Sequence, residues 1–353
     1  MLFKVEDLEK NYEEDEFAYI TQVFEKQSVQ YYSASSEVTS WQGIRKAGDN
    51  YLICGNSGEQ GLINIGPISY NENSSILFSV PYKGTGESEK VILTSVYGPN
   101  YLGDLDNVYN IQLCGVYRLE NGNMYGFFYD GISSQNSLEN PENYILNLTD
   151  GSEFYYLHST IGNLIVGNSV RNSTDTNIGN YAFIYDIETK DYIYLTYPGA
   201  TTTTVYGIWT NDNIIFTICG GYSKVYVPFD QIYQNGQPVP YGYGFVADFN
   251  LKDKKFSNWT TIIYPSDETA VTHFEGISGD GTDLYTLSAS SQTISMIASW
   301  VKIKRNVTGF QSLEYLDFSY GSNMTNNSVA GNANVGITHI NNEMVPYQAL
   351  VNT

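Results

Sequence analysis

Few residues of this sequence could carry chemistry, and two of them stand close together. His273 and Glu275 lie two positions apart in the stretch "THFEGIS". In an extended strand, residues i and i+2 point to the same side, so this imidazole and this carboxylate could act as a general acid–base pair. The chain has only three histidines and no Gly-x-Ser-x-Gly motif, so a serine–histidine–acid triad is not indicated.

Metal chemistry is not predicted. No His, Cys and carboxylate residues cluster at the short spacing of a zinc site. The stretches "GDLDN" at 103–107 and "SGDGTD" at 278–283 could suggest calcium loops, but neither has the ligand spacing of a calcium-binding hand. Turns rich in Asp and Gly need no metal, so we predict neither a metal nor a cofactor.

The elements that would position these residues come from an internal repeat, which the three cysteines reveal. Cys54, Cys114 and Cys219 each lie in an apolar run, in "NYLICGNS", "NIQLCGVY" and "IFTICGGYS". Aligning the chain on them adds three further anchors, which gives six repeats with spacings of 60, 52, 53, 68 and 48 residues. The added anchors are Val166, Leu287 and Val335. Because the three thiols fall in different repeats, we expect no disulfides.

A second column of residues supports this register. Before each anchor stands a small hydroxyl residue (a histidine in one repeat), then two residues and a glycine: "SWQG", "SVYG", "STIG", "TVYG", "HFEG" and "SVAG". Two further apolar runs follow most anchors. Four short strands repeated six times are typical of a propeller, so the sequence predicts an all-β, six-bladed β-propeller of four-stranded blades.

The last repeat ends at its third strand, "YQALV", which leaves one blade a strand short. The stretch "VQYYSA" at 29–34 matches the fourth-strand pattern. We therefore predict that residues 29–34 complete the C-terminal blade and close the ring, which also removes an exposed sheet edge. The predicted organisation is an acidic extension at 1–28 and one propeller domain at 29–353.

The innermost strands predict where a ligand would bind. The first and third positions of the four-residue column share one side of the strand, and the third position reads Gln42, Tyr97, Ile161, Tyr206, Glu275 and Ala330. A concave mouth with aromatic faces and a few convergent polar groups is a default binding site. The predicted ligand-binding residues are Gln42, Tyr97, His158, Tyr206, His273 and Glu275. The alternative is structural: hydroxyls and tyrosines at the axis could satisfy one another around trapped water.

The charge of the chain limits its partners. Thirty-eight acidic residues against 17 basic ones give a formal net charge of −21, which argues against nucleic acid and anionic membranes. No run of 18 apolar residues occurs, so no membrane insertion is predicted. The start "MLFKVEDLEK" lacks the basic and apolar regions of a signal peptide.

One stretch resembles a known repeat. "YAFIYDIETKDYIYLTYPGATTTTVYGIW", at 181–209, resembles the HAF-type repeat of bacterial extracellular proteins. Ala182-Phe183, Pro198-Gly199-Ala200 and Gly207-Ile208 match that repeat, whereas Tyr181 stands where the repeat has histidine. The resemblance implies a propeller and an extracellular or surface-associated protein. It implies no activity.

Three function classes follow from these observations. The first is a non-catalytic module that recognises a carbohydrate or a protein surface through tyrosines, which supply rigid contact area at low entropic cost. The second is a hydrolase or lyase acting on a polysaccharide, with His273 and Glu275 as catalytic residues. The third is a structural component of a surface layer or virion, with segment 1–28 as connector. Few convergent charges favour binding over catalysis.

Overall fold

The computed structural model describes most of the chain from residue 29 onward. The described ranges are 29–33, 38–68, 75–82, 90–102, 110–131, 138–149, 154–170, 180–224, 233–234, 237–238 and 242–352. The predicted acidic extension, 1–28, lies outside them.

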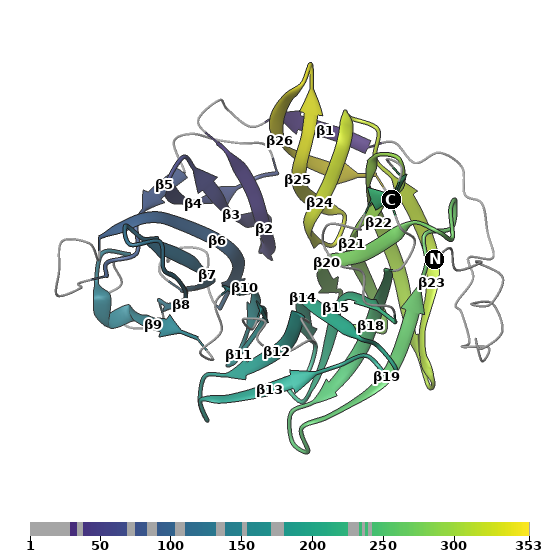
Figure 1. Ribbon diagram of the computed structural model, residues 1–353, viewed down its shortest axis with the longest axis horizontal. Coiled ribbons are helices and arrows are strands. Elements are labelled where there is room, and N and C mark those ends of the chain that lie inside the picture. The colour runs from purple at the N-terminus through teal and green to yellow at the C-terminus, as the bar shows by residue number, and fades with distance from the viewer. Residues whose placement is uncertain are drawn as a thin grey trace, which may run out of the picture.

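The described residues form six four-stranded antiparallel sheets arranged in a ring (Figure 1). This confirms the predicted six-bladed propeller. Because each blade is rich in β-branched and aromatic residues with turns of Gly and Asn, it can bury both faces only against its neighbours.

Blades 1 to 3 follow the chain from the innermost strand outward. Blade 1 consists of β2 (Ser40–Ala47), β3 (Asn50–Ser57), β4 (Gln60–Gly66) and β5 (Ser75–Phe78). Blade 2 consists of β6 (Val91–Tyr101), β7 (Ile111–Leu119), β8 (Met124–Asp130) and β9 (Tyr144–Leu148), with the short 3₁₀ helix η4 (Pro141–Asn143) before β9. Blade 3 consists of β10 (Phe154–Ile161), β11 (Leu164–Val170), β12 (Asn180–Asp186) and β13 (Asp191–Leu195).

Blades 4 and 5 repeat the pattern. Blade 4 consists of β14 (Thr202–Thr210), β15 (Ile215–Ser223), β18 (Tyr243–Asn250) and β19 (Lys255–Ile262). The two-residue strands β16 (Tyr233–Gln234) and β17 (Gln237–Pro238) pair with each other between β15 and β18. Blade 5 consists of β20 (Val271–Gly279), β21 (Leu284–Gln292), β22 (Met296–Asn306) and β23 (Gly309–Asp317).

Blade 6 combines strands from distant parts of the chain. It consists of β24 (Ser322–Ala330), β25 (Ala333–Ile340), β26 (Glu343–Val351) and β1 (Val29–Ser33). β1 runs antiparallel to β26, with Val29 opposite Val351 and Ser33 opposite Tyr347. The ring of Tyr31 stacks on that of Tyr320 at 4.8 Å between centroids, and its hydroxyl accepts a hydrogen bond from the Ser319 backbone N–H at 2.9 Å.

The core lies between the blades. Each innermost strand contacts the innermost strand of the next blade around the ring. The thiol of Cys54 reaches the carbonyl oxygen of Val96 in blade 2 at 3.5 Å, and that of Cys219 reaches the carbonyl of Phe274 in blade 5 at 3.7 Å. Cys54, Cys114 and Cys219 are all free and buried. Burial of small apolar residues against the next blade explains why the cysteine column marks the repeat.

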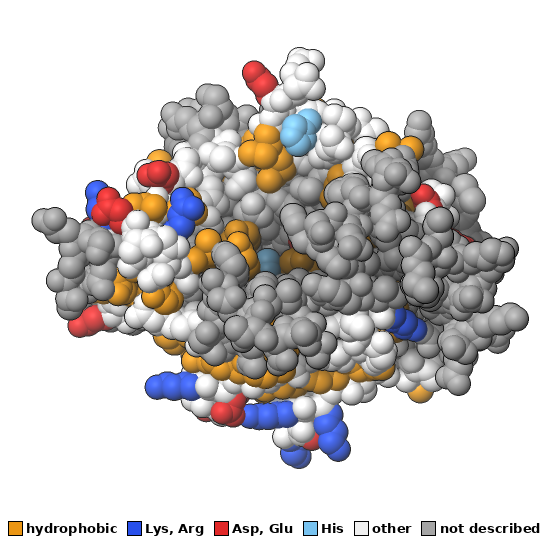
Figure 2. Space-filling view, in the orientation of Figure 1, with side chains coloured by type: hydrophobic (Ala, Val, Ile, Leu, Met, Phe, Trp, Pro, Cys, Tyr) orange, Lys and Arg blue, Asp and Glu red, His pale blue; other side chains and the backbone are white. Residues whose placement is uncertain are grey.

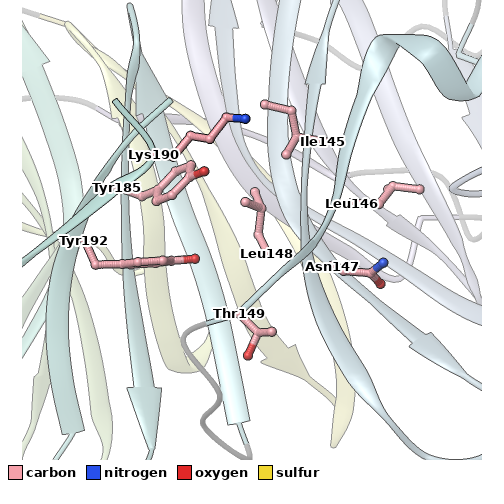
Figure 3. A pocket seen from close by; sticks show the side chains of 8 residues that line it. All are labelled: Ile145, Leu146, Asn147, Leu148, Thr149, Tyr185, Lys190 and Tyr192. Atoms are coloured by element: carbon pink, nitrogen blue, oxygen red, sulfur yellow. The ribbon is translucent and has the colours of Figure 1, made fainter. Parts of the chain in front are cut away.

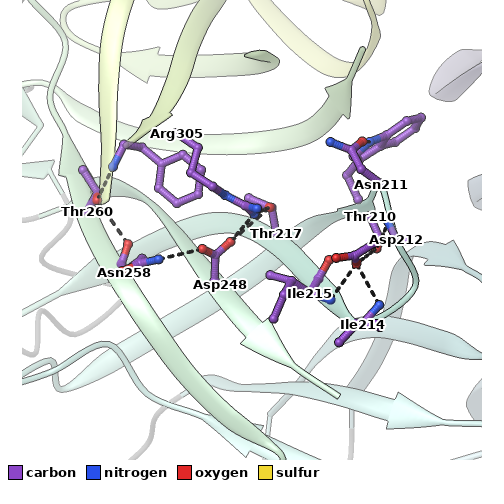
Figure 4. Close-up of polar contacts among 12 residues, drawn as sticks. Thr210, Asn211, Asp212, Ile214, Ile215, Thr217, Asp248, Asn258, Thr260 and Arg305 are labelled. Carbon is purple, nitrogen blue, oxygen red and sulfur yellow. Dashed lines mark hydrogen bonds and ion pairs between the residues drawn. The ribbon is translucent and has the colours of Figure 1, made fainter. Parts of the chain in front are cut away.

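A charged cluster joins blades 4 and 5 (Figure 4). Arg305 of β22 donates through Nη2 to the carboxylate of Asp248 and to the hydroxyl of Thr217, each at 2.5 Å. The other oxygen of Asp248 accepts from Asn258 Nδ2 at 2.9 Å. Since the Asp248 side chain is only 5% exposed, this pairing supplies the compensation that a buried carboxylate requires.

The described ranges contain very little helix. No helix in them is long and apolar enough to cross a bilayer.

Candidate functional site

The innermost strands share one irregularity. In all six blades, the pairing between the first and second strands skips one residue at an equivalent position, which forms a β-bulge. Blades 2 and 6 have a further irregularity earlier in the first strand, between Val91 and Leu93 and between Ser322 and Thr325. A bulge leaves its extra residue unpaired and redirects the side chain. The six residues skipped at the shared bulge are Gln42, Tyr97, His158, Tyr206, Glu275 and Asn327.

Close approach between blades explains the glycine that follows most bulges. A Cβ at Gly207 would lie 2.6 Å from the Cys219 sulfur and 3.0 Å from the backbone nitrogen of Ile277 in blade 5. No real side chain tolerates such contacts. The glycine therefore lets adjacent blades meet at the axis, which brings the bulged residues together.

Two of the predicted positions are wrong by three residues. Ile161 and Ala330 were expected at the axis in blades 3 and 6, but the bulged residues there are His158 and Asn327. The glycines used for the alignment, Gly162 (φ 58°) and Gly331 (φ 64°), instead lie in two-residue hairpin turns. The left-handed backbone of such a turn favours glycine.

Leu287, the fifth residue on which the repeats were aligned, is also one position out of register. Gly276 pairs with Ser288 rather than with Leu287, so Ser288 is the residue of blade 5 equivalent to Cys54 and Cys219.

Contacts between rings connect the site across blades 2 to 5. The centroid of the His158 ring lies 5.5 Å from that of Tyr97 and 4.6 Å from that of Tyr206. The Tyr206 centroid lies 5.5 Å from that of His273, and His273 Nε2 lies 2.6 Å from Glu275 Oε1. Five of the six predicted residues thus form one connected group.

The sixth, Gln42, belongs to the other side of the ring. Its Oε1 accepts a hydrogen bond from Asn327 Nδ2 at 3.2 Å, and the same nitrogen donates to the Trp41 carbonyl at 2.7 Å. Asn327 and Tyr156, whose ring stacks beside His158 at 6.1 Å, were missed by the sequence analysis. The dipeptide Gly-Asn between apolar residues in "IGNL" and "AGNA" is a hairpin signal that would have corrected the register.

The polar groups of the site differ in protonation. Desolvation lowers the pKa of His158 to about 4, despite the opposing charge of Glu275. Burial would also lower the pKa of His273, but the charge of Glu275 and the hydrogen bond to it outweigh burial and raise that pKa. Burial raises the pKa of Tyr97 to about 12 and raises that of Tyr206 further. At neutral pH His158 and both phenols are therefore uncharged, whereas Glu275 shifts the His273 imidazole toward its protonated form.

The site is open to solvent. The side chains of His273 and Glu275 are 27% and 19% exposed. Figure 2 shows a hollow at the centre of this face, with a histidine and apolar side chains at its floor. The six bulged residues, with His273 and Tyr156, are called the axial mouth below.

Arg45 closes the axis beneath the axial mouth. Its side chain is 4% exposed and crosses from blade 1 to the far blades. Nη2 donates to the hydroxyl of Ser159 in blade 3 at 2.8 Å and to the carbonyl of Ile208 in blade 4 at 3.3 Å. This residue was not singled out from the sequence, because nothing local distinguishes it from a surface arginine.

No family model matches the chain. No curated protein matches it either. Among solved structures, a luciferin-regenerating enzyme is 10% identical with a TM-score of 0.48, covering 92% of this chain and 95% of its own. The PQQ-bound aldose sugar dehydrogenase from Streptomyces coelicolor is 10% identical (TM-score 0.44; 92% and 99%), and a polysaccharide lyase is 8% identical (TM-score 0.37; 95% and 94%). Likeness at this level carries no argument about function.

A cleft of about 400 Å³ lies at the outer rim between blades 2 and 3. Figure 3 shows Tyr185, Lys190 and Tyr192 facing Ile145 and Leu148 across it. It has one charged side chain and no acid–base pair among its described lining residues. Within the described part of the chain, no three or more His, Cys, Asp or Glu residues are grouped to hold a metal.

Proposed function

We propose that the axial mouth binds a carbohydrate. The observation that supports this is the six-fold bulge, which presents rings, amides and one carboxylate from all six blades to a single concave surface. Tyr and His rings offer flat apolar faces with a polar edge, which suits the C–H faces and hydroxyl rims of sugars. Gln42 and Glu275 add oxygen acceptors, and Asn327 adds an amide.

The charges of the mouth favour a neutral sugar over an anionic one. His158, Tyr97 and Tyr206 are uncharged at neutral pH, and the charge of His273 is offset by Glu275 at 2.6 Å. The net charge of −21 also repels polyanions at long range.

Calorimetry of the full chain against neutral oligosaccharides tests this proposal. A sugar at 100 times its Kd should also stabilise the fold by about 2.7 kcal/mol in thermal unfolding. Tyr206→Ala and Tyr97→Ala should each weaken binding at least about 10-fold, or about 1.4 kcal/mol. Tyr194→Ala, at an exposed tyrosine of the outermost strand β13, is the matched control. An equal loss of affinity in all three variants, or no binding of any oligosaccharide, would contradict the proposal.

A polysaccharide hydrolase or lyase is the second candidate. It is favoured by the opposite pKa shifts of two histidines in the mouth: desolvation lowers the pKa of His158, which suits a proton acceptor, and Glu275 raises that of His273, which suits a proton donor. His158→Gln and Glu275→Gln should then abolish release of reducing ends or unsaturated products without abolishing binding. Retention of turnover in both variants would remove this candidate.

A further inference from the structure

A second cleft lies at the opposite end of the axis. It has a volume of about 710 Å³ and is lined by the C-terminal ends of β6, β10 and β14, three to five positions beyond their bulged residues. A strand that starts at one face of the ring ends at the other, so this cleft opens away from the axial mouth. Its size is that of a small-molecule site.

Arg45 lines this cleft and is incompletely satisfied. Of its five donors, three are used, by Ser159 Oγ, the Ile208 carbonyl and the Ile44 carbonyl, all neutral acceptors. Its Nε is buried with no hydrogen-bond partner in the described part of the chain. No described carboxylate forms an ion pair with it. A buried cation without an opposite charge is costly, which indicates that a ligand supplies one.

The guanidinium remains protonated in this setting. Burial lowers its pKa only to about 10. Of the three basic lining residues, Lys254 is already paired with Asp191 at 2.8 Å, and the lining also holds Asp186 and Glu188. The group that calls for a negative charge is therefore Arg45 itself, which is protonated and has no described carboxylate partner.

Trp209 gives the cleft a flat apolar wall. Its ring centroid lies 5.6 Å from the Arg45 guanidinium carbon, and its indole N–H donates to Asn211 Oδ1 at 2.8 Å, which fixes the ring plane. The polar side chains of Asn100, Asn163 and Thr210 line part of the cleft, and apolar side chains line much of the rest: Leu102, Ile161, Leu164, Phe216 and Leu251. A lining with flat apolar surface and a few polar groups suits a ligand with one flat apolar face and several hydroxyls.

We propose that this cleft binds a sugar acid, with its carboxylate at the Arg45 guanidinium and its ring against Trp209. A carboxylate would accept charge-assisted hydrogen bonds from the unused guanidinium donors. The site is independent of the axial mouth, so either proposal can fail alone.

The test compares D-glucuronate with D-glucose, which has a hydroxymethyl group in place of the carboxylate. Binding to the full chain is followed by calorimetry and by tryptophan fluorescence. Of the four tryptophans, only Trp209 lines the cleft; Trp41, Trp259 and Trp300 do not, so the Trp209 ring should dominate the change. Glucuronate should bind at least 10-fold more tightly than glucose, and Trp209→Phe should remove most of the fluorescence response while leaving the calorimetric signal.

Two substitutions decide the assignment. Arg45→Lys and Trp209→Ala should each weaken glucuronate binding at least 10-fold, whereas Arg118→Gln, at an exposed arginine of β7, should not. Should Arg45→Lys fail to fold, the glucuronate affinity of Trp209→Ala, compared with that of Trp209→Phe, decides the assignment. The proposal is overturned if glucuronate does not bind, if glucose binds equally well, or if affinity survives both substitutions.

Discussion

His273 Nε2 lies 2.6 Å from Glu275 Oε1, across the buried Phe274 that separates them in sequence. The bulge at Glu275 takes that residue out of the pairing with β21. Its carboxylate is thereby free to meet the imidazole at the axis. His273 and Glu275, the two residues that the sequence singles out for acid–base chemistry, are thus brought together by a β-bulge that all six blades share.

Replacing Glu275 should reduce stability most at low pH. The pKa of His273 is raised in the folded state, so the stability contributed by the pair is fully present below the ordinary value of 6.5 and is lost as pH rises through the folded pKa. Glu275→Gln should cost about 1 kcal/mol at pH 6 and less at pH 9, in urea denaturation. A cost independent of pH would contradict this. In the background of His273→Gln, the pH dependence of the cost should disappear.

His158 should make the native state acid-sensitive. Its folded pKa of about 4 lies below the ordinary value of 6.5, so the unfolded chain takes up a proton first as pH falls through that window. Between pH 7 and pH 4, the free energy of unfolding of the wild type should fall by up to about 3 kcal/mol more than that of His158→Gln. Denaturant titrations of both proteins at several pH values measure the difference. Parallel curves would show that the imidazole is not desolvated.

Adding one methyl group at Gly207 should destabilise the contact between blades 4 and 5. The new Cβ would overlap the Cys219 sulfur and approach the backbone of Ile277, so Gly207→Ala should cost about 2 kcal/mol. Removing the sulfur relieves one of these overlaps. The combined variant Gly207→Ala with Cys219→Ala should therefore lose less free energy of unfolding than the two single variants lose in sum. Strictly additive losses would show that the new methyl group does not overlap the sulfur.

Removing β1 should destabilise the ring. Without Val29–Ser33, the edge of β26 loses its partner strand, and blade 6 loses the packing of Tyr31 on Tyr320. Deletion of residues 1–34 should abolish cooperative thermal unfolding, whereas deletion of 1–28, which keeps β1, is the matched control. A shorter variant that melts cooperatively at the full-length temperature would show that β1 is dispensable.

The sequence by itself determined the repeat and much of the candidate site. Buried small residues at Cys54, Cys114 and Cys219 recur because each second strand packs against the next blade at the same depth. Local alternation and a glycine two positions after a buried residue were enough to place Tyr97, Tyr206 and Glu275 at the axis. These are short-range patterns, which a single chain displays directly.

Only the tertiary structure decided the rest. The hairpins at Gly162 and Gly331 shorten two repeats, so the register there is set by the pairing of whole strands. The bulged position of blade 3 belongs to His158, which was predicted at the mouth although outside the aligned column, and that of blade 6 belongs to Asn327, which was not predicted. Arg45 meets Ser159 and Ile208, 114 and 163 positions away in sequence. Such contacts arise from closing six blades around one axis, because ring closure brings together side chains that no local spacing relates.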